Sequence, residues 1–405
     1  MHCKIDIKLD FPILDKKIRD KVITYLDSAA STQKPKQVIN SISEFLENSY
    51  ENVHRGMNSL SIDATDLYEK SRDVAKNFIN SNSTNEIIFT RGATDSINII
   101  ANSLAEHLKE GDKIVVTELE HHSNYLPWMN LCKKLGLELK IIPISKDGIL
   151  SEDDIINNCD DSTKVLSLTH MSNVTGQILD IKKIKKSINK DTYVAVDGCQ
   201  SIAHLKIDVK DLDCDFYSFS SHKLYGPSGI GIMYGKEDIL NKLNPPTLGG
   251  GMINEVSSND FSYAMLPNKF EPGTPSIEAA IGFKTAMEYL NNNNYQDYFL
   301  NEKKLRSTLI KALREFKEVD IYGSNEDGNA TSIVSFNIKN QNFNDIATFL
   351  DQYGIMIRGG HHCCQPFMKK LGIPGSCRVS FGIYNDLNDI DHFIDSLKKT
   401  LKLLQ

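Results

Sequence analysis

Apolar positions along the chain follow two periods, which alternate. Short runs rich in branched and aromatic residues have the length and composition of buried strands. Segments with apolar residues three or four positions apart lie between these runs, as in amphipathic helices. The expected strands are 87–90, 113–120, 138–144, 164–178, 192–197, 215–221 and 229–235, and the expected helices are 37–53, 64–80, 95–108, 126–136 and 277–290. Strands that alternate with helices predict an α/β fold with a mostly parallel sheet of the seven-stranded kind, covered by helices on both faces. Functional residues then belong at the carboxyl ends of the strands.

A run of asparagines at 291–294 interrupts the helical pattern. Beyond it the alternation resumes on a smaller scale, which predicts a second, smaller α/β domain. Its expected strands are 331–339, 355–360 and 377–384, and its expected helices are 298–316, 344–354 and 389–404. We therefore place a domain boundary after residue 291.

The composition is that of a globular protein, with 405 residues, 40% of them hydrophobic and 24% charged. A chain of this length favours two domains. The net charge of -7 offers no broad basic face for nucleic acid. No apolar run approaches the roughly 20 residues of a membrane span, and the N-terminus lacks the pattern of a secretory or transit segment. These features predict a cytoplasmic protein or the mature form of an organelle protein, without nucleic acid or membrane partners.

The segment 215–229 carries a lysine at the end of an aromatic strand. Ser220, Ser221 and His222 precede Lys223, and the pattern breaks at Gly226. An amine in this position, flanked by hydroxyl groups and a histidine that can bind an anion, suits a Schiff base with pyridoxal phosphate. The alternative is a surface lysine in a turn.

Asp197 follows a hydrophobic run without a neighbouring basic residue, so its carboxylate is costly to bury alone. The protonated ring nitrogen of pyridoxal phosphate supplies the missing charge, and Gln200 can donate to the ring hydroxyl. The segment 87–94 reads as a strand, a glycine turn and a helix start, which presents backbone N–H groups to a phosphate. Ala93 and Thr94 belong to this cradle.

Other polar residues near expected strand ends can be interpreted either as site residues or as ordinary loop or surface residues. His121 can stack on a flat ring or lie in an ordinary loop. Asn173 can bind a substrate carboxylate or the cofactor. Arg378 can form a bidentate pair with an α-carboxylate, although a strand arginine can also face solvent. His54 and Arg55 connect two helices, where they either line the site or are solvated.

Eight cysteines, irregularly spaced, indicate reduced thiols rather than a disulfide framework. Cys363 and Cys364 stand in a glycine-hinged loop, 358–366, beside two histidines. A metal site here is disfavoured, because consecutive residues converge poorly on one ion. A disulfide between the two cysteines would be strained. The third interpretation is a reactive cysteine, its thiolate favoured by the histidines and Arg358.

Several stretches resemble the SufS-type cysteine desulfurases of the class V aminotransferase family. The resemblance covers about Tyr25 to Asn385 and rests on the motifs YLDSAAS, NVHRGMNSLS, EHHSNYLPW, VDGCQS, SSHKLYGPSGIG, FEPGTPS, RGGHHCCQP and CRVSFGIYN. It implies a large pyridoxal phosphate domain at 22–291, and a small domain formed by 1–21 and 292–405 that carries the cysteine loop. It also implies a homodimer, in which Thr274 reaches the cofactor phosphate of the neighbouring subunit, and ring stacking by His121.

The resemblance further implies the reaction. Lys223 would hold pyridoxal phosphate, Arg378 and Asn173 would hold L-cysteine, and Cys363 would take the substrate sulfur as a persulfide. An acceptor protein of the SufE or SufU kind and a cluster scaffold would then receive the sulfur for iron-sulfur cluster assembly. Cys364 departs from the family pattern and leaves open which thiol attacks. The rivals are a selenocysteine lyase, another lyase or transaminase on the same fold, and a carrier protein without catalysis.

Overall fold

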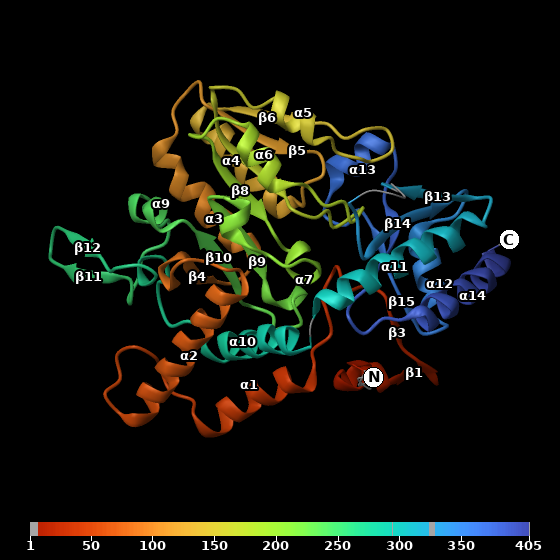
Figure 1. The fold of residues 1–405 in the computed structure, drawn as a ribbon, viewed down its shortest axis with the longest axis horizontal. Coiled ribbons are helices and arrows are strands. Elements are labelled where there is room, and N and C mark those ends of the chain that lie inside the picture. The colour runs from red at the N-terminus through yellow and green to blue at the C-terminus, as the bar shows by residue number, and fades with distance from the viewer. Residues whose placement is uncertain (1–6, 294, 324–328, 405) are drawn as a thin grey trace.

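The computed structural model describes residues 7–293, 295–323 and 329–404, except for the side chains at 295 and 296. Its centre is a sheet of seven strands in the order β4-β10-β9-β8-β7-β5-β6 (Figure 1). Strand β10 runs antiparallel to its neighbours β4 and β9, and the other pairs are parallel. The predicted fold class is thus confirmed. The strands are β4 (Ile87–Thr90), β5 (Lys113–Thr117), β6 (Glu138–Ile142), β7 (Thr163–Thr169), β8 (Tyr193–Asp197), β9 (Phe216–Ser220) and β10 (Gly231–Gly235).

Helices cover both faces of this sheet. Successive residues of β5 show why: Val115 belongs to one apolar cluster, whereas Ile114 and Val116 belong to another on the opposite face. Both faces are buried, so successive residues of inner strands such as β5 and β9 are buried rather than alternately exposed. The helices of this part are α1 (Lys36–Asn48), α2 (Ser59–Phe78), α3 (Ala93–Leu104), α4 (Leu126–Leu135), α5 (Glu152–Asn157), α6 (Ile181–Ser187), α7 (Ser201–His204), α8 (Val209–Leu212), α9 (Glu237–Lys242) and α10 (Ile277–Asn292).

A smaller antiparallel sheet with its own apolar cluster lies beside the large one (Figure 1). Its strands, in spatial order, are β13 (Val319–Tyr322), β14 (Ile333–Ile338), β17 (Ser376–Ser380) and β16 (Arg358–Gly360). The helices α11 (Tyr295–Arg314), α12 (Phe343–Asp351), α13 (Gln365–Leu371) and α14 (Leu387–Leu404) belong to this half. The single strand predicted at 355–360 is divided: β15 (Ile355–Met356) pairs with β3 (Thr24–Tyr25), and only β16 joins β17.

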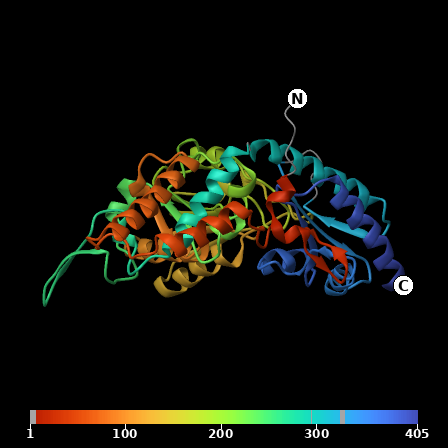
Figure 2. The ribbon, with the colours of Figure 1, turned by 90° about the horizontal axis from the view of Figure 1, so that it is seen from below.

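The N-terminal segment lies at the junction of the two halves (Figure 2). The ring of Phe11 packs edge to face on Tyr225 and Tyr289 and also on Tyr384. The segment therefore contacts residues on both sides of the predicted boundary. The division into 22–291 and 1–21 with 292–405 stays a prediction, and its residues 1–6, 294, 324–328 and 405 lie outside the described residues.

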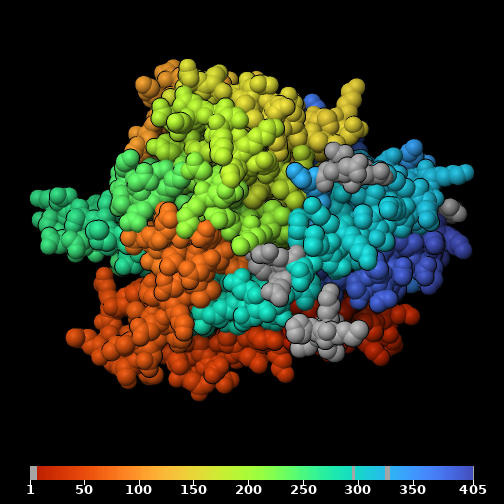
Figure 3. Space-filling view, in the orientation of Figure 1, coloured from red at the N-terminus to blue at the C-terminus, as the bar shows by residue number. Residues whose placement is uncertain are grey.

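Two features depart from the sequence interpretation. Strand β7 ends at Thr169, and Met171 pairs with Ile178 in an isolated bridge, so Asn173 lies in the loop beyond the strand. A two-stranded ribbon, β11 (Ile253–Val256) with β12 (Phe261–Tyr263), was not predicted. It projects from the large sheet (Figures 1 and 3). In the described part of the chain, no helix has the length and apolar character to cross a membrane.

Candidate active site

Loops at the carboxyl edge of the large sheet enclose a cavity of about 210 Å³. Asp197 is the last residue of β8, Ser220 is the last residue of β9, and Lys223 follows Ser220 within one short turn. The loop after β16 closes the cavity from the small sheet. Most predicted site residues line it: Ala93, Thr94, His121, Asn173, Asp197, Ser220, His222, Lys223, Cys363 and Arg378.

Asp197 is a buried carboxylate, 5% exposed. Its Oδ1 accepts a hydrogen bond from the backbone N–H of Cys199 at 3.0 Å. Within the described residues, no basic side chain pairs with it at 4.0 Å or less. Burial without a counter-ion is costly for a carboxylate. The position therefore fits a ligand that brings a positive charge to this wall of the cavity.

The start of α3 forms an anion cradle. Gly92 has a φ of 146°, which favours glycine, and it lets the chain turn from β4 into the helix. The N–H of Ala93 donates to Ser220 Oγ at 2.8 Å, and Thr94 Oγ1 lies 2.7 Å from Ser123 Oγ. Helix N–H groups in the first turn lack intrahelical acceptors, and the helix dipole is positive there. Hydroxyl groups around such a helix start suit a phosphate.

Two histidines in the cavity are neutral at pH 7. Burial and the charge of Lys223 lower the pKa of His121 to about 3. Burial, Lys223 and Lys34 lower the pKa of His222 to about 4. The Nδ1 of His121 accepts from the backbone N–H of Ser123 at 3.1 Å, which fixes the ring. A fixed, uncharged imidazole ring can stack on a flat heteroaromatic ring.

Arg378 is 2% exposed and enters the cavity from β17. Its Nη1 donates to Asn173 O at 3.0 Å, and its Nη2 donates to Asp27 Oδ1 at 3.0 Å. The buried Nε has no hydrogen-bond partner. The other oxygen of Asp27 accepts from Arg358 Nε at 3.1 Å. One carboxylate thus serves two guanidinium groups, and the surplus positive charge with the unpartnered Nε suits a carboxylate ligand.

The cysteine loop is tied to the large sheet. Cys363 is exposed, and its carbonyl oxygen accepts from the N–H of His122 at 2.7 Å. The preceding carbonyl, of His362, accepts from Asn173 Nδ2 at 2.8 Å. Both His362 and Cys363 have a φ above 50°, an uncommon conformation for residues with side chains. These contacts hold the Cys363 thiol over the cavity that contains Lys223.

Cys364 differs from Cys363 in its exposure. Its side chain is fully buried, and its Sγ donates to Glu120 O at 3.3 Å. Burial and the Glu120 carboxylate raise the pKa of the Cys364 thiol far above its ordinary value. A buried, protonated thiol is a poor nucleophile. Among the described residues, no three His, Cys, Asp or Glu side chains are grouped to hold a metal ion.

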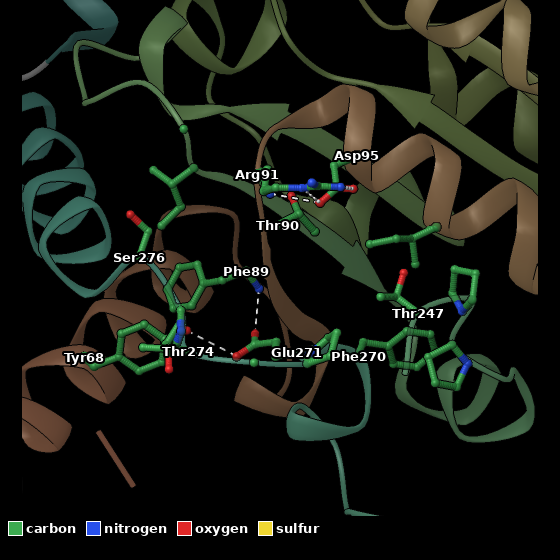
Figure 4. A pocket seen from close by; sticks show the side chains of 18 residues that line it. Tyr68, Phe89, Thr90, Arg91, Asp95, Thr247, Phe270, Glu271, Thr274 and Ser276 are labelled. Carbon is green, nitrogen blue, oxygen red and sulfur yellow. Dashed lines mark hydrogen bonds and ion pairs between the residues drawn. The ribbon is translucent and has the colours of Figure 1, made fainter. Parts of the chain in front are cut away.

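Four predicted residues do not line this cavity. Gln200 is buried behind it and donates to Ala29 O at 2.9 Å. His54 pairs with Glu69 at 2.9 Å on α2, and Arg55 is exposed nearby. Thr274 lines a second cavity, of about 330 Å³, together with Arg91 and Asp95 (Figure 4). That cavity lies by the residues that precede and begin α3.

Several residues that the structure adds to the site had no site role in the sequence analysis, notably Asp27, Ser123 and Cys199. Asp27 had a detectable signal, because it is a carboxylate directly after the short apolar run at 23–26. Its partners Arg358 and Arg378 lie more than 300 positions along the chain. Only the folded chain reveals the pairing.

The fold is that of the class V aminotransferases. Residues 24–393 match the family model described as aminotransferase class-V, so the chain belongs to that family. It is 44% identical over 393 residues, 96% of this chain and 95% of the relative, to a probable cysteine desulfurase of Staphylococcus epidermidis. A cysteine desulfurase structure from Thermococcus onnurineus matches with a TM-score of 0.94 and 36% identity, and covers 99% of both chains. The cysteine desulfurase CsdA of Escherichia coli matches with a TM-score of 0.90 and 33% identity, over 98% of both chains.

Proposed function

We propose that this chain is a cysteine desulfurase that uses pyridoxal phosphate, converts L-cysteine to L-alanine and takes the sulfur onto Cys363. The observation that carries the proposal is that the Cys363 loop lines the same cavity as Lys223, Asp197 and Arg378. A transaminase has no evident use for an exposed thiol at this place. The close relatives bear the same name.

The donor set fits pyridoxal phosphate. Asp197, buried without a counter-ion, suits the protonated ring nitrogen, and the start of α3 with Ser220 suits the phosphate. His121 would stack on the ring. Gln200, which does not line the cavity itself, would donate to the ring hydroxyl. Lys223 would anchor the aldehyde carbon. When bound, this cofactor withdraws electrons from the substrate and acidifies its Cα–H bond.

Other residues of the chain bind the substrate and move its protons. The guanidinium group of Arg378 binds the α-carboxylate of L-cysteine, and the carbonyl oxygen of Asn173 keeps Arg378 in place. The amine of Lys223 removes the proton from Cα and later returns one. Asp197 keeps the ring nitrogen protonated throughout. The His121 ring shares the cavity with Lys223 and is uncharged at pH 7, so it does not repel the ammonium form of Lys223.

Cys363 performs the sulfur transfer. Its thiolate attacks the sulfur of the substrate, a new S–S bond forms and the Cβ–S bond breaks. The electron pair of the broken bond stays with the substrate carbon, which becomes the methyl group of alanine after protonation. The products are L-alanine and a Cys363 persulfide, so the substrate carbon is reduced while the two sulfur atoms are oxidised. The exposed position of Cys363 leaves the persulfide accessible to an acceptor protein.

Two partner assignments belong to the same proposal. The sulfur passes to an acceptor of the SufE or SufU kind and then to a cluster scaffold. The chain also forms a homodimer, in which the exposed Thr274 meets the cofactor phosphate of the neighbouring subunit. In support, Thr274 lies in a surface cavity outside its own chain's Lys223 site.

Turnover of L-cysteine tests the proposed function directly. The protein loaded with pyridoxal phosphate is incubated with L-cysteine and dithiothreitol, and alanine and sulfide are quantified. Equal amounts of the two products are expected. Pyruvate with ammonia, or transfer of the amino group to a keto acid, would instead identify another lyase or a transaminase.

The carboxylate site gives a separate prediction. Arg378→Gln removes a charge-assisted pair with the substrate, worth about 2 to 3 kcal/mol, and we expect kcat/KM to fall roughly 100-fold, mainly through KM. Arg19→Gln is the matched control, because Arg19 also pairs with an aspartate, Asp351, but has a half-exposed side chain and does not line the cavity. We expect a change of less than about 5-fold there. Equal effects of the two substitutions on steady-state kinetics would contradict the assignment.

A further inference from the structure

The carbonyl oxygen of His222, immediately before Lys223, is surrounded by donors from residues 31–34. The backbone N–H and the hydroxyl of Thr32 both lie 3.0 Å from it. The hydroxyl of Ser31 donates at 3.2 Å, and the ammonium group of Lys34 donates at 3.1 Å. A carbonyl oxygen has two lone pairs, so this concentration of donors on one acceptor is unusual.

Lys34 is the charged member of this group. Its Nζ also donates to Thr32 O at 2.6 Å, and no carboxylate pairs with it in the described part of the chain. Burial alone lowers the pKa of Lys34 to about 8. Lys34 is partly buried, and withdrawing an ammonium group from water with only carbonyl partners costs folding free energy. Such local departures from a stabilising arrangement are concentrated at functional sites.

The turn after Lys223 is held by the same segment. Tyr225 has a φ of 61°, an unfavourable conformation for an aromatic residue, and its N–H donates to Thr32 Oγ1 at 2.8 Å. The backbone is therefore pinned on both sides of Lys223, by contacts to His222 and to Tyr225. Residues 31–34 themselves lie nearly 190 positions earlier in the chain.

We propose that Lys34 is a positioning residue for Lys223: its ammonium group fixes the His222 carbonyl, and thereby the backbone from which the catalytic lysine extends. This inference rests on the proposed function. Lys223 anchors the cofactor and then moves a proton at the substrate Cα, so its side chain must change position while its backbone stays in place. A charged donor holds a carbonyl more firmly than a neutral one, which explains a lysine at position 34.

Three substitutions at position 34 test the proposal, with turnover measured on the holoenzyme and cofactor binding on the apoprotein. Lys34→Met removes the donor, Lys34→Gln keeps a neutral donor, and Lys34→Arg keeps a charged one. The matched control is Lys36→Met, the same change at an exposed lysine two residues away. The measurements are kcat and KM for L-cysteine, the rate at which the apoprotein gains its visible absorbance band on addition of pyridoxal phosphate, and the melting temperature.

For Lys34→Met we expect kcat to fall about 10-fold or more while KM stays within about 2-fold, because a misplaced Lys223 slows the chemical step and not substrate binding. The absorbance band should form several-fold more slowly. Lys34→Gln should lie between Lys34→Met and the unaltered protein, and Lys34→Arg should recover most of kcat. Lys36→Met should match the unaltered protein. Lys34→Gln supplies the same comparison if the methionine variant does not fold.

A lower melting temperature with unchanged kcat and unchanged band formation would overturn the proposal and leave Lys34 a purely structural role. Failure of the unaltered protein to bind pyridoxal phosphate or to turn over L-cysteine would count against the proposed function instead. The two failures are therefore distinguishable.

Discussion

Replacement of Cys363 by alanine should abolish sulfide and alanine formation from L-cysteine, with a loss of about 1000-fold or more in kcat, because a nucleophile that acts in the bond-breaking step cannot be bypassed. The cofactor should remain bound, because the groups proposed to hold it, Lys223, Asp197 and Ser220, do not depend on the thiol. The visible absorbance band of the variant should therefore match that of the unaltered protein. Product analysis and absorption spectra check the two parts separately.

Cys364→Ala is the matched control for this experiment. Its thiol is fully buried and donates to Glu120 O, so we expect it to contribute to packing and loop position and not to sulfur attack. We expect kcat within about 3-fold of the unaltered protein, with some loss of stability from the small cavity created. Full activity in Cys363→Ala, or a loss in Cys364→Ala as large as that expected for Cys363→Ala, would contradict the assignment of the nucleophile.

Replacement of Lys223 by alanine should remove both the anchor of the cofactor and the base at the substrate Cα. We expect turnover to fall by about 1000-fold or more, a loss comparable to removal of a catalytic base together with a covalent anchor. The visible band of the linked cofactor should be absent. Activity assays and absorption spectra of the variant, purified with added pyridoxal phosphate, give the two readouts.

Borohydride reduction followed by peptide mapping provides the control for the assignment of Lys223. Borohydride reduces the link between cofactor and lysine, and peptide mapping of the unaltered protein should then find the pyridoxyl group on Lys223 alone. In Lys223→Ala no lysine peptide should carry it. A pyridoxyl group on a different lysine, or turnover above a few per cent in the variant, would show that another amine holds the cofactor.

The central sheet was predictable because its strands are buried on both faces. The residues of β5 are buried at every position and the three central ones are apolar, so the run stands out without any knowledge of its neighbours. The same logic located Asp197 and Lys223, since polar residues at the ends of such runs lie at the carboxyl edge of the sheet. Their presence in one cavity agrees with that expectation.

The less regular elements were not predictable in the same way. The strand expected at 355–360 is divided because Ile355 pairs with Thr24, a partner more than 300 positions away, whereas Arg358 pairs within the small sheet. The strands of the ribbon β11–β12 are short and largely exposed, and polar residues interrupt their apolar ones, so they lack the continuous apolar run of a core strand. Pairing of this kind depends on contacts that a local pattern does not encode.

The amino-acid sequence by itself determined the α/β class, the edge at which the site lies, and the chemistry available there, because local burial patterns and residue types suffice for these. The tertiary structure decided which residues cooperate. Asp27 joins Arg358 and Arg378, Lys34 meets the carbonyl before Lys223, and Cys364 turns into the core while Cys363 faces the cavity. These relations depend on contacts between distant segments and on the backbone direction of one loop, and neither property can be read from residues adjacent in sequence.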